Sequence, residues 1–420
     1  MRAIAQTLGA LIGVLSSSCY GCGREPGVGG TGGSLGGSIG QGGGGGGSAG
    51  GAGGTSTPGS AGGPGGDGGA SASAGGGGGA TAGMGGGTDT DAGVDADAGG
   101  TDAAPQPTLR SAASISGRFF GAALGAAHLA EPDYAAVAAA EFSFATPENE
   151  MKWNATEKTR GTFTFDGGDA IVAFAAQNNL LVKGHTLVWH NQLPSWVPAI
   201  QDATDLHDAM INHITQVVSH YRDQVVAWDV VNEAVADNGQ SLRSSIFFQY
   251  LGAGYIDDAF NAAHAADPGA RLYYNDYGAE GMNAKSNAVY GLVQGMLSRG
   301  VPINGVGLQM HTGANSSSPS AADVARNMQR LADLGLDVMI TEMDVQICTG
   351  DLPAQSTRFH DIVAACVTQP ACKAVTVWGI PDKYSWLNGQ TCATPRPLLF
   401  DDAYLAKPAY MSVIDAFLGR

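Results

Sequence analysis

The chain has 420 residues, 65 of them glycine, and a formal net charge of −17. A strongly acidic chain without clusters of lysine and arginine is a poor match for a phosphate backbone, so nucleic acid is excluded as an expected partner. Composition changes sharply along the chain and divides it into three predicted segments. These are a targeting segment at 1–22, a low-complexity linker at 23–104 and a globular domain at 105–420.

The first segment has the features of an export signal. A basic start, Met1-Arg2, precedes the apolar run AIAQTLGALIGVL, which is too short to span a bilayer. The next residues, SSSCYGCG, resemble a bacterial lipoprotein signal in which Cys19 would carry the lipid. The match departs in one respect, because the large apolar residue Leu15 lies four positions before the cysteine instead of three. We expect either a lipoprotein at the bacterial surface or outer membrane, or free secretion.

The second segment consists mostly of Gly, Ser, Thr and Ala, with aspartates near its end. It has almost no large apolar side chains, so it gains too little on packing to offset the entropy of ordering. We therefore expect a disordered linker. A flexible chain of ~80 residues has a root-mean-square span of roughly 50 Å. This span suits a tether, and an inert spacer is the alternative.

Eight short apolar runs follow in the globular segment, each typical of a strand. They are 119–124, 142–146, 180–189, 225–233, 270–278, 305–311, 337–345 and 374–380. Between them lie stretches with helical periodicity, for example 206–222, 256–267 and 320–335. Eight alternations of strand and helix predict an α/β fold, a closed (β/α)₈ TIM barrel. No GxGxxG turn or P-loop follows the first run, which disfavours a nucleotide-binding sheet.

Polar and aromatic residues stand at the ends of seven of these runs. Asn232 and Glu233 end the fourth run, and Glu342 lies in the seventh. Because the carboxyl ends of barrel strands surround one mouth, these residues should meet there. Two glutamates, several Trp and Tyr, and many neutral hydrogen-bonding groups indicate a sugar site, since flat aromatic faces stack on sugar rings.

Other site chemistries fit the strand ends less well. A phosphate site would favour arginine, and these strand ends carry none. His185, His190 and His311 could hold a metal in principle, but they stand on different runs without a ligand spacing such as HExxH. The sequence therefore predicts neither a metal nor an organic cofactor.

Four cysteines lie in the last quarter of the chain, and an even number in an exported domain indicates disulfides. Cys366 and Cys372 flank a short loop before the eighth run. Cys348 and Cys392 follow the seventh and eighth runs, whose ends are neighbours at the mouth. We therefore predict the pairs Cys366–Cys372 and Cys348–Cys392.

Seven motifs in the globular segment together resemble glycoside hydrolase family 10, the endo-β-1,4-xylanases of clan A. They are, in family order, ATPENEMKW, VKGHTLVWHNQLPSW, AWDVVNEAV, LYYNDYG, GLQMH, ITEMDV and VWGIPDKYSW. The resemblance covers roughly residues 117–420. It implies hydrolysis of internal β-1,4 bonds of xylan and xylo-oligosaccharides, by double displacement with retained configuration (EC 3.2.1.8). We expect a monomer.

The resemblance also implies a role for each matching residue. Glu233 corresponds to the general acid/base and Glu342 to the nucleophile, which His311 and Asp344 orient or tune. Asn232 matches the residue that bonds the sugar's 2-hydroxyl. The other matching positions are Lys152, His185, Trp189, Gln309, Trp378 and Trp386 around the cleaved sugar, Glu148, Asn149 and Gln192 one sugar further towards the non-reducing end, and Tyr277 on the leaving-group side.

Two positions depart from the family pattern. Pro381 stands where Thr, Ala or Val is usual, and Leu387 follows Trp386 where Arg is common. These departures affect the expected wall of the eighth loop. Two other functions stay open: a related clan A β-glycanase that cuts cellulose or mixed β-glucan, and a catalytically silent, tethered sugar-binding protein. Asp229 and Asp276 are interpreted as structural partners at strand ends.

Overall fold

The computed structural model describes residues 106–315, 319–348 and 351–420. The predicted targeting segment, the linker and Cys19 lie outside the described residues. Within those three ranges, no helix has both the length and the apolar character that a membrane crossing requires.

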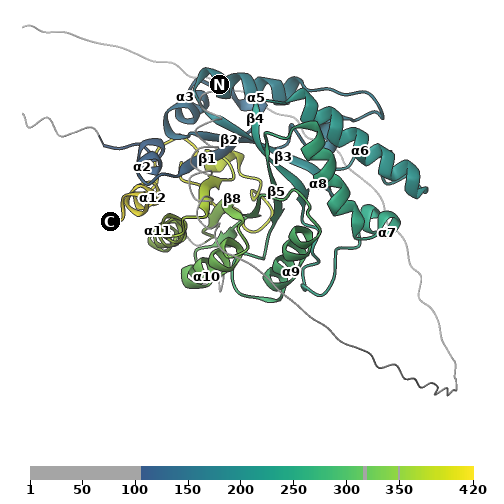
Figure 1. The fold of residues 1–420 in the computed structure, drawn as a ribbon. Helices are drawn as coiled ribbons and strands as arrows, with labels where there is room; N and C mark the ends of the chain where they lie inside the picture. Colours follow the sequence, from purple (N-terminus) through teal and green to yellow (C-terminus); the bar gives the residue numbers. More distant parts are fainter. Residues whose placement is uncertain (1–105, 316–318, 349–350) are drawn as a thin grey trace, which may run out of the picture. The chain divides into compact units, whose positions relative to one another are not determined.

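The predicted barrel is confirmed. Its parallel strands are β1 (Phe119–Leu124), β2 (Phe144–Pro147), β3 (Leu181–Trp189), β4 (Val225–Asn232), β5 (Arg271–Asp276), β6 (Gly305–Leu308), β8 (Asp337–Gln346) and β9 (Cys372–Val377). Each strand pairs with its neighbour in this order, and β9 pairs with β1 to close the ring (Figure 1). Every carboxyl end therefore opens onto one mouth.

The sixth predicted strand is wrong in one respect, because the structure divides the run 305–311. β6 ends at Leu308, and a three-residue strand, β7 (His311–Gly313), pairs separately with β8. Met310 between them has φ +68°, a left-handed conformation that interrupts a strand. Its N–H donates to Glu280 Oε1 at 3.2 Å instead of to a neighbouring strand.

Helices surround the barrel (Figure 1). The longer ones are α2 (Leu109–Ile115), α3 (Pro132–Glu141), α5 (Asp166–Gln177), α6 (Ala203–His220), α8 (Gly254–Ala266), α9 (Ala284–Ser298), α10 (Ala321–Ala332), α11 (Leu352–Thr368) and α12 (Pro408–Leu418). The shorter elements are η1 (Ala126–His128), α4 (Trp153–Thr156), α7 (Ile246–Leu251) and η2 (Asp382–Tyr384).

Local sequence explains where these helices begin and which face they bury. The side chains of Asp202 and Ser320 each accept a hydrogen bond from the N–H three residues later, which caps α6 and α10. Along α6, Met210, Ile214 and Val217 are buried, at the spacing of one helix face. The three helices predicted at 206–222, 256–267 and 320–335 are therefore α6, α8 and α10, with ends that differ by a few residues.

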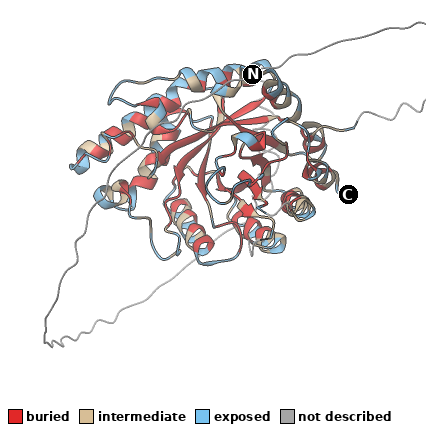
Figure 2. Ribbon diagram, turned by 180° about the vertical axis from the view of Figure 1, so that it is seen from behind, coloured by how far each residue is buried: buried red, intermediate tan, exposed pale blue. Residues whose placement is uncertain are grey.

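Two apolar clusters hold the fold together. The larger one joins the outward faces of the strands to the inward faces of the helices, so buried residues line the helix–sheet boundary in Figure 2. The smaller one contains only strand residues, among them Phe144, Tyr273 and Met339, and it fills the barrel axis. The barrel is thus a packed support for the residues at its mouth.

Both predicted disulfides are present. Cys366–Cys372 joins the end of α11 to the start of β9, at the end of the barrel opposite the mouth. Cys348–Cys392 links the segment after β8 to the loop after η2, and its Cα atoms are 5.8 Å apart. The second bridge therefore lies on the rim, and Cys392 is in the same loop as Trp386.

Candidate active site

A cleft of about 710 Å³ opens at the carboxyl ends of the strands. Of the fifteen predicted site residues, fourteen line it, and Asp344 is buried behind the wall. The fourteen are Glu148, Asn149, Lys152, His185, Trp189, Gln192, Asn232, Glu233, Tyr277, Gln309, His311, Glu342, Trp378 and Trp386. Segments far apart in the sequence thus converge on one cavity.

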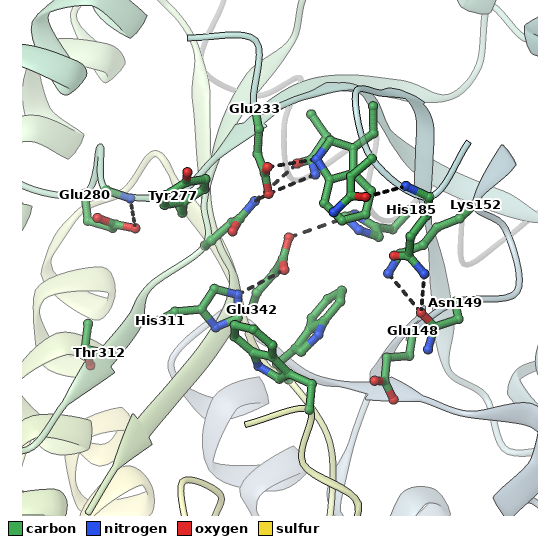
Figure 3. Close-up of a pocket in the computed structure, with 18 of the residues that line it drawn as sticks. Glu148, Asn149, Lys152, His185, Glu233, Tyr277, Glu280, His311, Thr312 and Glu342 are labelled. Atoms are coloured by element: carbon green, nitrogen blue, oxygen red, sulfur yellow. Dashed lines mark hydrogen bonds and ion pairs between the residues drawn. The ribbon is translucent and has the colours of Figure 1, made fainter. Parts of the chain in front are cut away.

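Glu342 lies in the middle of this cleft, with His311 beside it and Glu233 across from it (Figure 3). One carboxylate oxygen, Oε1, accepts a hydrogen bond from Asn275 Nδ2 at 2.6 Å. The other, Oε2, is 3.3 Å from His311 Nε2, and His185 Nδ1 lies 3.9 Å from Oε1. These contacts hold both oxygens of a buried carboxylate in place.

Electrostatics keep Glu342 ionised. Burial alone would raise the pKa of Glu342, but attraction to His185 and the hydrogen bond and charge of His311 outweigh it and lower the pKa to about 2. Burial opposes the charged form of His311 as well, yet Asp344, 2.8 Å from His311 Nδ1, raises the pKa of His311 to about 10. At neutral pH, Glu342 is therefore a carboxylate paired with an imidazolium.

Glu233 follows directly after β4 and is held by neutral donors. Trp189 Nε1 donates to its Oε2 at 2.8 Å, and Gln309 Nε2 donates to its Oε1 at 3.0 Å. Asn232 Nδ2 lies 3.4 Å from the same Oε1. No cation contacts this carboxyl as closely among the described residues, so the environments of the two glutamates differ, as the two roles in acid/base and nucleophilic chemistry require.

Asn275 joins the two glutamates and was not among the predicted site residues. Its amide donates to Asn232 Oδ1 at 2.9 Å as well as to Glu342, and Thr341 Oγ1 donates to Asn275 Oδ1 at 2.7 Å. The hydrogen bond from Asn275 orients Asn232, which lies beside Glu233. The position of Asn275 at the end of the fifth predicted strand was the available signal.

A polar group forms one end of the cleft, on the side where Glu148, Asn149 and Lys152 appear in Figure 3. Asn149 Oδ1 accepts hydrogen bonds from Lys152 Nζ at 3.0 Å and from Gln192 Nε2 at 3.3 Å. Burial lowers the pKa of Lys152 and raises that of Glu148. Such desolvated donors and acceptors suit the hydroxyls of a sugar.

Aromatic side chains form the remaining walls. The ring of Trp378 meets His185 edge-on at 5.2 Å, and Trp386 meets His311 at 5.0 Å between ring centroids. Trp386 Nε1 also donates to Asp344 Oδ2 at 2.9 Å, so this tryptophan shares Asp344 with His311. Tyr277 lies at the opposite end from Asn149, after β5 (Figure 3).

The floor of the cleft contains a cluster that could be mistaken for a metal site. Single ligand atoms of His185, Asp229 and Glu342 all lie within 4.8 Å of one another. However, the ammonium of Lys183 is hydrogen-bonded to Asp229, whose Oδ2 also lies 2.9 Å from His185 Nδ1. The lysine already supplies the positive charge that a metal would bring. Asp229 is thus a structural partner, as predicted.

The family profile of Glycosyl hydrolase family 10 matches residues 108–416. This chain belongs to glycosyl hydrolase family 10. It is 41% identical over 289 residues to endo-1,4-beta-xylanase B of Thermotoga neapolitana, with 67% of this chain and 82% of the relative covered. It is 39% identical over 311 residues to an endo-1,4-beta-xylanase of Agaricus bisporus, with 71% and 91% covered.

Solved structures of family 10 agree with this assignment. Native xylanase 10B from Thermotoga maritima superposes with a TM-score of 0.72 at 39% identity, covering 74% of this chain and 98% of that one. Xylanase 10B from Thermotoga petrophila RKU-1, solved in complex with xylobiose, gives the same TM-score and identity, with 75% and 98% covered. Both comparisons leave about a quarter of this chain unmatched.

The two departures from the family pattern lie behind the aromatic wall of this family 10 chain. Pro381 forms a parallel bridge with Phe400, and Leu387 is 5% exposed. A buried leucine therefore stands next to Trp386 in this loop, at a position where the family commonly has a charged side chain. The loop also carries Gln390, whose Nε2 donates to the carbonyl of Trp386 at 2.7 Å.

The ion pair at the centre of this site predicts a pH-dependent stability. The pKa of His311 is raised from 6.5 to about 10, so its stabilising effect is complete below pH 6.5 and is lost as pH rises to 10. The pKa of Glu342 is lowered from 4.5 to about 2, so its effect is complete above pH 4.5 and is lost towards pH 2. His311→Asn should therefore lower Tm most between pH 4.5 and 6.5.

Thermal unfolding of the wild-type protein and of His311→Asn between pH 3 and 10 measures the difference in Tm. His360→Asn is the matched control, because His360 is paired with Asp361 on the exposed surface. That variant should change Tm little. A Tm difference for His311→Asn that stayed constant from pH 4.5 to 10 would contradict the assignment of the ion pair.

The two disulfides should affect different properties. Alanine at both Cys348 and Cys392 releases the loop that carries Trp386, so KM for xylo-oligosaccharides should rise about 3–10-fold, equivalent to ~1 kcal/mol of binding. Alanine at both Cys366 and Cys372 acts far from the cleft and should lower Tm with KM unchanged. Steady-state kinetics and thermal unfolding of the two variants test this. A KM for the variant without Cys348 and Cys392 equal to that of the wild-type protein would refute the role assigned to the rim disulfide.

Proposed function

We propose that this chain is an endo-1,4-β-xylanase that hydrolyses xylan with retention of configuration. The observation that carries this proposal is the contrast between two glutamates in one cleft. Glu342 is held ionised by His311, whereas Glu233 receives hydrogen bonds from neutral Trp189 and Gln309. Membership of family 10 and relatives named endo-1,4-beta-xylanase at 39–41% identity support the same activity.

The proposed reaction has two displacements. The carboxylate of Glu342 attacks the anomeric carbon while protonated Glu233 gives its proton to the departing oxygen, and a covalent glycosyl-enzyme forms. Glu233, now ionised, removes a proton from water, which attacks the same carbon and releases Glu342. Two inversions restore the β configuration. Asn232 is placed to bond the sugar's 2-hydroxyl, where hydrogen bonds strengthen in the transition state.

The proposed substrate is a chain of xylose units. Xylose lacks the hydroxymethyl group that glucose carries, so walls close to the sugar admit xylan and reject cellulose by contact. Trp378, which is 6% exposed and meets His185, and Gln192 at the polar end of the cleft supply such walls. The xylobiose complex of the Thermotoga petrophila enzyme supports this choice of ligand.

Reducing-sugar release from xylan, cellulose and mixed β-glucan, measured side by side with the purified protein, tests the proposal. We expect release from xylan to exceed the others roughly 10-fold or more, because a pocket that excludes a substituent discriminates at least that strongly. Faster release from cellulose or β-glucan would identify a β-glucanase instead. Retention of xylan on the protein without any release would identify a sugar-binding protein.

We also propose that the protein is exported, acts as a monomer and is held at the bacterial surface by a lipid on Cys19, with residues 23–104 as the tether. The apolar segment before Ser16 and the small residues before Cys19 support this. Mass spectrometry of the native N-terminus should find a diacylglycerol-modified Cys19. A free N-terminus beyond Cys22 would overturn the lipid anchor and leave free secretion.

A further inference from the structure

The backbone at Glu233 has a conformation that its side-chain contacts do not explain. Glu233 has φ +58°, in the left-handed region that residues other than glycine adopt uncommonly. Such conformations persist where surrounding contacts impose them, and they are concentrated at functional sites. The contacts of the main chain around Glu233 therefore indicate what sets the direction of its carboxyl.

One side of this turn is fixed by β5. The N–H of Glu233 donates to the carbonyl of Asn275 at 2.9 Å, and the N–H of Val235 donates to the hydroxyl of Tyr274 at 3.1 Å. These bonds attach the turn to the strand next to it. They leave the carbonyl of Glu233 to a different partner.

That partner is Arg243, in the loop between β4 and α7. Its Nε donates to the carbonyl of Glu233 at 3.0 Å, and its own main-chain N–H donates to the carbonyl of Ala234 at 2.7 Å. The Arg243 side chain is only 19% exposed, so these bonds are largely shielded from water. Arg243 thus holds the peptide group next to the proposed acid/base.

The same guanidinium reaches the leaving-group side of the cleft. Its Nη2 donates to the Tyr277 hydroxyl at 3.1 Å and to Asp237 Oδ1 at 2.7 Å, and the Tyr277 hydroxyl also bonds Asp237. Lys285 Nζ lies 3.6 Å from the centroid of the Tyr277 ring and fixes it from another side. Because a guanidinium is planar and rigid, the Glu233 carbonyl and the Tyr277 hydroxyl that it binds are held in a fixed relative geometry.

We propose that Arg243 is a positioning residue that couples the carboxyl of Glu233 to the sugar platform at Tyr277. The inference rests on the proposed retaining hydrolysis, in which Glu233 transfers the proton. A leaving sugar placed against Tyr277 brings its oxygen into a fixed relation with the group that holds Glu233. Proton donor and departing oxygen are thereby aligned, and a displacement of about 1 Å between them costs on the order of 10²-fold in rate.

The experiment compares Arg243→Met with the wild-type protein on two substrates that differ in their need for a proton. Cleavage of a xylo-oligosaccharide releases a sugar alcohol, which is a poor leaving group and needs the proton of Glu233. The kcat/KM for this substrate should therefore fall about 10–100-fold. The dinitrophenolate of a dinitrophenyl β-xylobioside leaves without protonation. The kcat/KM for this substrate should therefore stay within about 3-fold of the wild-type value. Its kcat and KM should fall together, because ionised Glu233 also activates the water that hydrolyses the intermediate.

Three further variants separate positioning from a loss of stability. Arg243→Lys keeps one donor and should recover part of the lost oligosaccharide activity. Tyr277→Phe removes only the hydroxyl connection, so it should lower oligosaccharide turnover less than Arg243→Met does. Arg118→Met is the matched control: Arg118 also donates to main-chain carbonyls, those of Val367 and Gln369, but before β1 at the opposite end of the barrel. It should lower Tm and leave the ratio of the two substrates unchanged.

The outcomes distinguish this inference from the proposed function. If the wild-type protein cleaves both substrates and Arg243→Met lowers both kcat/KM values equally, or neither, the positioning role is overturned and the xylanase activity stands. If the wild-type protein cleaves neither substrate, the proposed function itself fails. A selective loss on the oligosaccharide alone supports the coupling.

Discussion

Glu342→Ala is expected to abolish turnover of every substrate, because the carboxylate proposed to form the covalent intermediate is removed. Removal of the nucleophile in another hydrolase costs on the order of 10⁶-fold, and we expect a loss of this order. Added azide should restore cleavage of activated aryl xylosides, since the small anion enters the space that the carboxylate leaves. Azide displaces the aryl oxide in one step, so the product should be the inverted α-glycosyl azide.

Product configuration, read by NMR, is the decisive measurement for this variant. Glu148→Ala is the matched control, because Glu148 is another carboxylate lining the cleft. That variant should turn over without azide and release β products. A covalent glycosyl-enzyme trapped on Glu342→Ala, or β-glycosyl azide formed by it, would show that Glu342 is not the nucleophile.

Glu233→Ala should behave differently. Xylan carries a poor leaving group and should lose ~10²–10⁴-fold in rate, the usual contribution of general acid/base catalysis. Aryl glycosides with good leaving groups need no proton and should still form the glycosyl-enzyme. The intermediate then accumulates, because no base activates water. Azide should attack it and give a β-glycosyl azide with retained configuration.

A burst of released phenol, followed by slow turnover, measures this accumulation, and mass spectrometry locates the sugar on Glu342. Gln309→Ala removes one donor to Glu233 and leaves the carboxyl in place, so it should show a smaller loss and no azide product. If Glu233→Ala gave the inverted product instead, the roles of the two glutamates would be exchanged.

Much of the site could be predicted because chemistry-bearing residues end buried strands. Glu233 follows β4 and Glu342 lies within β8, and strand ends of a barrel meet at one mouth regardless of their separation in sequence. The apolar runs gave the strands, since residues buried on both sides have no polar alternation. Family motifs then assigned different roles to polar residues that, by their position at strand ends alone, could not be told apart.

What was missed depends on geometry that no local pattern encodes. Arg243 lies in an irregular loop, and nothing in NGQSLRSS indicates that a guanidinium returns to the carbonyl of Glu233. The break at Met310 was missed because GVGLQMH reads as a continuous apolar run, whereas its left-handed residue is fixed by Glu280, thirty positions earlier. The first feature is a contact within one irregular loop and the second is a contact between two loops, and neither leaves a periodic pattern in the sequence.

The rim disulfide has a consequence for how the protein is produced. Cys348 is exposed, whereas Cys366 and Cys372 are fully buried, so a reductant reaches the rim bridge first. Oxidised protein that is later exposed to a mild reductant would keep the buried bridge and unfold with a normal cooperative transition, yet lack the covalent support of one cleft wall. Purity and folding would then be poor guides to specific activity, and a thiol count would have to accompany every kinetic measurement.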